Sequence, residues 1–345
     1  VPSLLRGFSA PVILADGLDD ADLLVLLAHD TDPFNRWDAG QRLGLQRLIA
    51  GVRDGGVTLD AAYLDAMRGV LRHPSLDAAF KELVLTLPSE SYVAEQLDAS
   101  DPQRVHAVRE AARLQLAQAL RDDWEWAWEA HQVRGYEPDP LPAGRRALAN
   151  LALSMLCLDA VARGDDVWPG RAYQRFKDAA HMTDAQGAVG ALVAAGSALA
   201  EPALERFYER YRREALVVDK WFSIHATAPE RDGAVYARVH QLLRHPDFSL
   251  ANPNRARSLI GAFCMNNPAA FHRPDGAGYG FWADRVLELD AINPQLAARI
   301  ARVMDRWTRL VDPYRQHARG AIERVAGHAN LSSDVREIVS HALEV

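Results

Sequence analysis

The sequence predicts an all-α protein, a superhelical, solenoid-like array of antiparallel helix pairs with a short extended lead-in at the N-terminus. Three observations indicate this fold. Apolar residues recur at i, i+3, i+4 and i+7 in segments of about 10–20 residues, the spacing of amphipathic helices. Alternation with a period of two, which would indicate strands, is almost absent after the first dozen residues. The joints between segments are short and carry Pro or Gly, so consecutive helices should fold back on one another.

The first element is the exception to the helical pattern. Residues 8–14 predict either one short strand or an extended lead-in, and we assign residues 1–15 to the lead-in and residues 16–345 to one helical domain. A proline-rich loop is predicted at 136–144, but its two flanks look alike and no fixed-period repeat is present. The helical apolar faces then follow in order at 23–27, 37–52, 63–71, 105–120, 147–161, 185–199, 204–211, 235–243, 280–289, 296–310, 314–325 and 335–343.

Helix starts are marked by short polar residues, whose side chains accept hydrogen bonds from the first-turn amides. Thr183-Asp184 is one such candidate. The pairs Asp101-Pro102, Asn252-Pro253 and Asn293-Pro294 are stronger candidates, because each places Pro at the first helical position, where its missing N–H costs nothing.

Composition limits the classes of function. The chain has 345 residues, of which 49% are hydrophobic and 25% charged, as in ordinary globular proteins. Its formal net charge of −7 argues against a nucleic-acid partner. No apolar run is long enough to cross a bilayer, so we expect no membrane partner either. The two cysteines and the lack of a signal peptide indicate a reducing, cytoplasmic location. Because the chain starts at Val1 without an initiator Met, we expect it to be part of a longer polypeptide.

The motifs of a self-sufficient hydrolase are missing. A zinc peptidase of the His-Glu-x-x-His type needs two His four residues apart on one helix, with Glu directly after the first. None of the 12 His is followed by Glu, and none has another His four residues on. The sequence also lacks a Gly-x-Ser-x-Gly elbow and a Gly-rich phosphate loop. It therefore predicts no catalytic residue, no metal ligand and no cofactor within this chain.

One part of the chain departs from the helical composition. Residues 219–222 and 245–279 are dense in Asn, Pro, Gly and aromatic side chains. Such residues build caps and tight turns, so they can simply fix helix joints. Irregular backbone can also line a cavity and carry function, and the sequence leaves both interpretations open.

A series of short motifs carries a family resemblance over essentially the whole chain. The motifs are Val1–Arg6 with Phe8–Val12, Arg36–Ala39, Leu85–Ser89, Met182–Ala185, Val218–Phe222, Asn252–Phe263 and Asn267–His272. In this order, the series resembles the C-terminal domain of the bacterial aminopeptidase N, or alanyl aminopeptidase, family.

The resemblance implies a parent zinc exopeptidase that removes N-terminal residues from peptides. Its zinc and catalytic groups would lie in an upstream catalytic domain, and residues 1–15 would lead in from an upstream β-domain. The present domain would be a non-catalytic superhelix that covers the active site and controls access to it. Its partners would be that catalytic domain and peptide substrates. By the same likeness, Arg257, Gln295 and Arg299 would contact the C-terminal side of the substrate.

Physical arguments support part of this assignment. Asn293 as the cap and Pro294 at the first position place Gln295 and Arg299 one turn apart on one helix face. A guanidinium is well shaped to bind a carboxylate through two hydrogen bonds. These side chains can equally be ordinary solvated surface groups. The alternative function, a free-standing helical-repeat adaptor that binds proteins through a concave face, fits the composition and helix pattern equally well.

Overall fold

The fold is all-α, as predicted. A computed structural model describes residues 1–12 and 14–344; 69% of the chain is helical, and no strand is present in these two ranges. The first helices are α1 (Asp20–His29), α2 (Pro33–Asp54), α3 (Ala61–Arg72), α4 (Ala78–Leu85), α5 (Glu90–Glu95), α6 (Pro102–Ala119), α7 (Arg121–Ala130), α8 (Pro140–Ala162), α9 (Val167–Asp178), α10 (Met182–Ala195) and α11 (Ala200–Tyr211).

Several of the remaining elements are short and irregular. They include one π-helical turn, η1, and two 3₁₀ turns, η2 and η3. In order they are α12 (Ala215–Ala226), α13 (Ala234–Leu242), α14 (Pro253–Ala256), η1 (Arg257–Gly261), α15 (Ala262–Asn266), α16 (Pro268–Phe271), α17 (Ala277–Asp290), α18 (Pro294–Ala301), η2 (Arg302–Met304), η3 (Trp307–Arg309), α19 (Tyr314–Ala326) and α20 (Ser333–Leu343).

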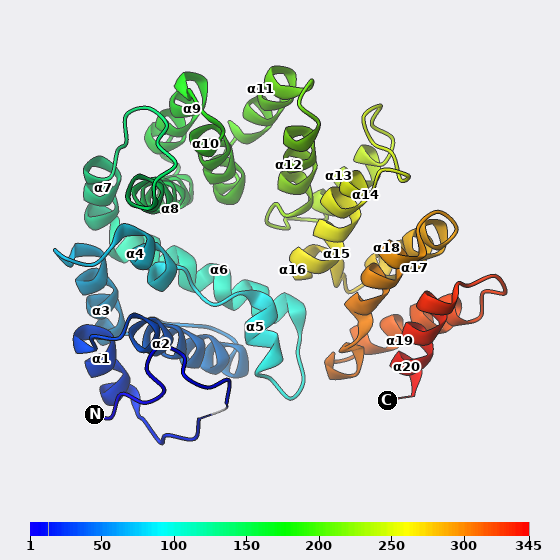
Figure 1. The fold of residues 1–345 in the computed structure, drawn as a ribbon, viewed down its shortest axis with the longest axis horizontal. Coiled ribbons are helices and arrows are strands. Elements are labelled where there is room, and N and C mark those ends of the chain that lie inside the picture. Colours follow the sequence, from blue (N-terminus) through cyan, green and yellow to red (C-terminus); the bar gives the residue numbers. More distant parts are fainter. Residues whose placement is uncertain (13, 345) are drawn as a thin grey trace. The chain divides into compact units, whose positions relative to one another are not determined.

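The chain forms two compact units, and its path between them is not simple. Unit 1 comprises residues 1–93 and 107–203, and unit 2 comprises residues 94–106 and 204–345. Figure 1 follows this course by colour along the helices. The short segment 94–106 therefore belongs to unit 2, although the chain on both sides of it belongs to unit 1.

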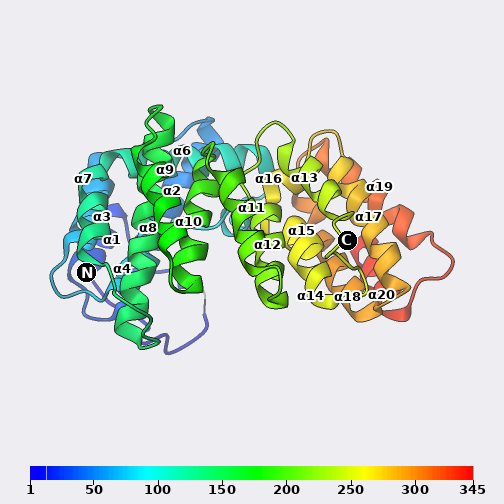
Figure 2. The ribbon, with the colours of Figure 1, turned by 90° about the horizontal axis from the view of Figure 1, so that it is seen from above.

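Unit 1 is built around α8, which is buried along most of its length. Helices α4, α7, α9 and α10 pack on it, and α8, α9 and α10 lie side by side in Figure 2. Helix α10 lies close to α8 because α10 is rich in small residues. A Cβ at Gly187 would lie 2.5 Å from the side chain of Asn150 on α8. The run of Ala and Gly in this part of the sequence is thus a tightly packed helix.

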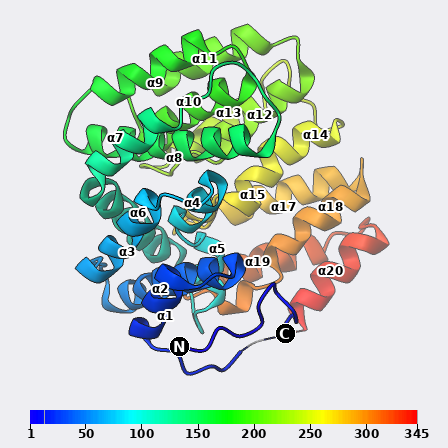
Figure 3. The same ribbon diagram turned by 60° about the vertical axis from the view of Figure 1, so that its left-hand side comes forward.

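The N-terminal lead-in folds back on α1 and α2 (Figure 3). The Arg6 guanidinium donates to the Asp30 carboxylate at 3.1 Å, and the Asn35 amide donates to the Leu4 carbonyl at 2.8 Å. The Gly7 N–H donates to Asp32 at 2.8 Å. The alternative of a short strand at 8–14 is wrong for the described residues of that range, because none of them lies in a strand and no second strand pairs with this backbone. Position 13 lies outside the described residues.

Unit 2 packs α17, α18, α19 and α20 against one another, and Figure 3 shows α17, α18 and α20 side by side. The buried Trp282 ring donates its N–H to the Ile300 carbonyl at 3.0 Å, which ties α17 to α18. Segment 94–106 contains an isolated parallel bridge: the Ser100 N–H donates to the Arg309 carbonyl at 2.7 Å, and the Val311 N–H donates to the Ser100 carbonyl at 3.1 Å.

Most predicted helix starts are confirmed. Asn252 and Asn293 cap α14 and α18, and the Asp101 carboxylate accepts from the Gln103 N–H at the start of α6. Thr183-Asp184 is wrong as a cap: α10 begins one residue earlier, with His181 as its N-cap. The helix expected at 296–310 is also wrong in its second half. It ends at Ala301 and continues as the 3₁₀ turns η2 and η3, which lead into the backbone bridge with Ser100.

Candidate functional site

The predicted site residue Arg257 lies on an irregular helical segment. The Asn252 side chain accepts hydrogen bonds from the amides of Asn254 and Arg255, at 3.0 and 3.4 Å, and Pro253 occupies the first position of α14. After one turn the helix widens into η1, where the Ala262 N–H bonds the Arg257 carbonyl five residues back. Single π-helical turns of this kind are frequent at functional sites, and nothing in the sequence predicted this one.

Arg255, two residues before Arg257, is a structural residue. Its side chain is only 9% exposed and forms an ion pair with Asp219 of α12. The same guanidinium donates to the carbonyl oxygens of Asp247 and Ala215, each at 2.9 Å. Because one arginine joins α14 to α12 and to the loop before α14, it fixes the start of the irregular segment in place.

Arg257 has the opposite environment. Its side chain is exposed, and its closest polar contact is a long one of 3.4 Å to the Asn254 side-chain oxygen. Within residues 1–12 and 14–344 it pairs with no carboxylate. The structure therefore presents a charged guanidinium whose donors are available for a ligand.

Gln295 and Arg299 lie together on one exposed face of α18. The Asn293 side chain accepts from the Leu296 N–H at 3.0 Å and starts this helix, as expected. Leu296 and Ile300 on the opposite face are buried, so Gln295 and Arg299 point away from the core. The structure thus brings these two predicted residues together, whereas Arg257 lies on the separate element η1.

An aromatic and histidine cluster supports the α12 side of this region. Trp221 and His225, one turn apart on α12, meet edge to face with ring centroids 4.6 Å apart, and His245 contacts Trp221 at 5.2 Å. Burial, with smaller contributions from Arg238 and His245, lowers the pKa of His225 to about 3. The Tyr208 hydroxyl donates to Asp247 at 2.6 Å. These rings form a core, which agrees with the joint-fixing interpretation of this part of the sequence.

His272 is also a core residue. Its Nδ1 lies 2.9 Å from the Tyr279 hydroxyl, and burial lowers the pKa of the imidazole to about 4. A neutral ring bonded to a buried tyrosine stabilises the joint between α16 and α17. It is not placed as an exposed ligand group.

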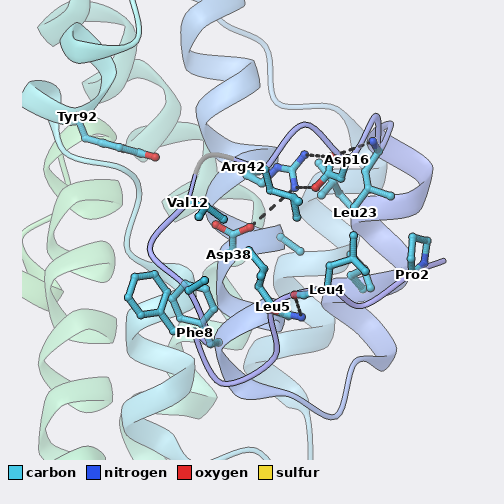
Figure 4. A pocket seen from close by; sticks show the side chains of 17 residues that line it. Pro2, Leu4, Leu5, Phe8, Val12, Asp16, Leu23, Asp38, Arg42 and Tyr92 are labelled. Atoms are coloured by element: carbon cyan, nitrogen blue, oxygen red, sulfur yellow. Dashed lines mark hydrogen bonds and ion pairs between the residues drawn. The ribbon is translucent and has the colours of Figure 1, made fainter.

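A second candidate is a pocket of about 370 Å³ in unit 1, between the lead-in and helices α1 and α2. Figure 4 shows the Arg42 side chain directed at Asp16, to which it donates hydrogen bonds at 2.7 and 2.9 Å. Asp38 is 3.9 Å from the same guanidinium, and burial raises the pKa of its carboxyl group. Phe8 and Val12 of the lead-in line the apolar part. Arg42 and Asp16 satisfy each other within the pocket, and residues of the lead-in form one of its walls.

The described residues do not fit a zinc site. In the part of the chain that the structure describes, no three His, Cys, Asp or Glu side chains are grouped so that they could hold a metal ion. Both cysteines are buried, and burial raises the pKa of the Cys157 thiol to about 12. Within the same described ranges, no helix combines the length and the apolar character needed to cross a bilayer.

Comparison with known proteins identifies the fold and its relatives. A sequence-family model described as "Domain of unknown function (DUF3458_C) ARM repeats" matches residues 20–344. The chain belongs to the DUF3458_C family. Its members' ARM repeats are stacked helices, in agreement with the predicted solenoid-like array.

The relatives of this DUF3458_C chain are aminopeptidases. It is 40% identical to aminopeptidase N of Caulobacter vibrioides over 347 residues, which cover 99% of this chain and 39% of that protein. It is 36% identical to aminopeptidase N of Escherichia coli, with the same coverage. The crystal structure of Legionella pneumophila aminopeptidase A in complex with aspartic acid superposes with a TM-score of 0.87 at 30% identity, over 99% of this chain and 40% of that chain.

The DUF3458_C chain therefore spans about two fifths of the length of the relatives it matches. It corresponds to their C-terminal domain, and the resemblance inferred from the sequence motifs is confirmed.

Proposed function

We propose that this chain is the non-catalytic C-terminal domain of a zinc-dependent aminopeptidase that hydrolyses the N-terminal residue of peptides in the cytoplasm. The observation that carries the proposal is the 40% identity to an aminopeptidase N over 99% of the chain. Zinc and the catalytic groups would be supplied by an upstream catalytic domain of the same polypeptide. The helical domain would cover the active site and control which peptides reach it.

Within this domain, Arg257, Gln295 and Arg299 would contact the C-terminal side of the substrate. Their exposure supports the proposal, as does the lack of a carboxylate partner for either arginine in the described parts of the chain. Peptides carry a carboxylate at that end, and a guanidinium binds it with charge-assisted hydrogen bonds. Gln295 can add a neutral donor and acceptor for the peptide backbone.

The adaptor alternative is disfavoured. A free-standing helical adaptor needs only a pattern of repeats, whereas this chain keeps 36–40% identity to aminopeptidases along its whole length. The fold alone would fit both functions, so this end-to-end identity makes the distinction.

The test compares the isolated chain with the longer polypeptide encoded by its reading frame. The isolated chain should show no turnover of alanyl or leucyl anilides and no tightly held zinc. The longer polypeptide should bind about one zinc per chain and hydrolyse both substrates, with the activity lost on chelation. Chelator-sensitive turnover by the isolated chain, or a longer polypeptide without aminopeptidase activity, would contradict the proposal.

A further inference from the structure

The π-helical turn η1 releases one backbone carbonyl. In a regular α-helix the Ala262 N–H would bond the carbonyl of Ser258, four residues back. In η1 it bonds the carbonyls of Arg257 and Leu259 instead, so the Ala262 N–H no longer serves the Ser258 carbonyl. A released carbonyl in a half-buried position needs another partner, because a buried acceptor without a hydrogen bond destabilises the fold.

Ser223 of α12 supplies that partner. Its hydroxyl donates a hydrogen bond to the Ser258 carbonyl at 3.1 Å, across 35 residues of sequence. In a regular α-helix the Ser258 carbonyl would accept from the Ala262 N–H, so the hydroxyl takes the place of that donor. Ser223 therefore stabilises the wide turn against the regular one.

The same face of α12 also contacts the residues that precede Arg257. Asp219 lies one helical turn before Ser223 and pairs with the buried Arg255. The two contacts of α12 thus fall on Arg255 and Ser258, which flank Arg257 in the sequence. Arg257 itself makes only the long contact to Asn254. Its direction is therefore set by the backbone on either side rather than by contacts of its own side chain.

We propose that Ser223 is a positioning residue: by bonding the Ser258 carbonyl it maintains the π turn that directs Arg257 towards the carboxylate of a peptide substrate. This inference rests on the proposed function of Arg257. Closing the turn removes one residue from the helical register and rotates Arg257 by about 100° relative to the helix that follows. Such a rotation would move a guanidinium out of reach of a bound carboxylate.

The experiment uses the longer, active polypeptide with four variants: Ser223→Ala, Ser223→Thr, Arg257→Ala and the double variant Ser223→Ala with Arg257→Ala. The substrates are one tripeptide with a free carboxylate and the same tripeptide as its C-terminal amide. Ser223→Ala should raise KM and lower kcat/KM for the free acid by about three- to tenfold, and should leave the amide within about twofold. Ser223→Thr keeps the hydroxyl and should behave as the unmodified enzyme.

The double variant separates positioning from general damage. If Ser223 acts through Arg257, removing the hydroxyl from the Arg257→Ala enzyme should cause no further loss on either peptide. A crystal structure of Ser223→Ala should show the Ala262 N–H bonded to the Ser258 carbonyl.

Three results would overturn the inference. The first is a Ser223→Ala enzyme whose kcat/KM falls equally for the acid and the amide. The second is a double variant whose loss of kcat/KM equals the two single losses combined. The third is that Arg257→Ala lowers kcat/KM for the acid more than for the amide, whereas Ser223→Ala does not. In that case the role of Ser223 fails and the proposed role of Arg257 stands. If Arg257→Ala itself treats acid and amide alike, the proposed role of Arg257 fails and the inference fails with it.

Discussion

The Arg255 guanidinium and the Asp219 carboxylate form an ion pair in which both side chains are nearly enclosed, at 9% and 13% exposure. The pair joins α14 to α12, and Arg255 donates two further hydrogen bonds to backbone carbonyls at 2.9 Å. Arg257, two residues later, is exposed and has no ion pair in the described chain. Arg255 therefore stabilises the fold, whereas Arg257 is available to a ligand. Single substitutions can distinguish these two roles.

Removing either member of the buried pair should destabilise the protein. Arg255→Ala and Asp219→Ala should each lower the free energy of unfolding by about 3 kcal/mol, because the remaining charge is left buried without its partner. Arg257→Ala is the matched control and should change it by less than about 0.5 kcal/mol. Urea unfolding followed by circular dichroism measures all three. Equal effects at Arg255 and Arg257 would contradict this division of roles.

Arg257 and Arg299 should instead affect catalysis by the longer enzyme. A charge-assisted contact to a substrate carboxylate is worth about 1.5–3 kcal/mol when partly desolvated. Substituting either arginine by Ala should lower kcat/KM for di- and tripeptides by roughly ten- to a hundredfold. Single-residue chromogenic anilides have no carboxylate at that position and should be nearly unaffected. Equal loss of kcat/KM on both substrate classes, or no loss on either, would mean that neither arginine binds the substrate carboxylate.

Two glycines of α17 give a matched pair for stability. A Cβ at Gly278 would lie 1.8 Å from the Phe271 carbonyl oxygen, so Gly278→Ala requires the backbone of α16 to move. We expect it to cost about 3 kcal/mol or more. Gly280 has no atom within 4 Å of a Cβ, and Gly280→Ala should stabilise the helix by about 0.5–1 kcal/mol. Thermal melting of the two variants checks both signs; a stable Gly278→Ala protein would show that the close approach is not required.

His225 should make the protein less stable in acid. Its pKa of about 3 in the folded state lies below the value near 6.5 of an unfolded chain, so the unfolded state binds the proton more readily between these values. Stability should fall as pH decreases below about 6.5, by up to about 1.4 kcal/mol per pH unit from this group.

The matching variant is His225→Phe, which keeps an aromatic ring against Trp221 and removes a buried nitrogen that lacks a hydrogen-bond partner. It should flatten this part of the pH dependence without loss of stability at pH 7. Urea unfolding at a series of pH values from 7 to 4 measures the slope. An unchanged slope in His225→Phe would mean that other groups dominate the acid response.

What could be predicted from the sequence was local. Asn252 and Asn293 cap helices because each side chain bonds an amide two or three residues ahead, and short sequence motifs contain that information. The apolar spacing of the long helices is local in the same sense, and it predicted the all-α fold. The same local signals placed Gln295 and Arg299 on one exposed face of α18.

What could not be predicted depends on distant partners. The wide turn at Arg257 is stabilised by Ser223, which lies 35 residues before Ser258, and the burial of Arg255 depends on Asp219, 36 residues before it. The early end of α18 similarly leads to a bridge with Ser100, far away in the sequence. Arg255 and Arg257 look equivalent in the motif, and only these distant contacts show that one is structural.

Segment 94–106 has a consequence for biosynthesis. Glu95 meets Arg309, which lies 214 residues later in the chain, and Ser100 pairs with the backbone at 309–311. At about 5–20 residues per second, a ribosome needs roughly 10–40 s to make the intervening chain. Until residue 309 has been made, Glu95 and Ser100 lack these partners, while the helices before and after the segment can already pack. Unit 2 can therefore be completed only near the end of translation. A ribosome that stalls after unit 1 has emerged but before residue 309 is made leaves a nascent chain in which Glu95 and Ser100 are still open to chaperones and proteases.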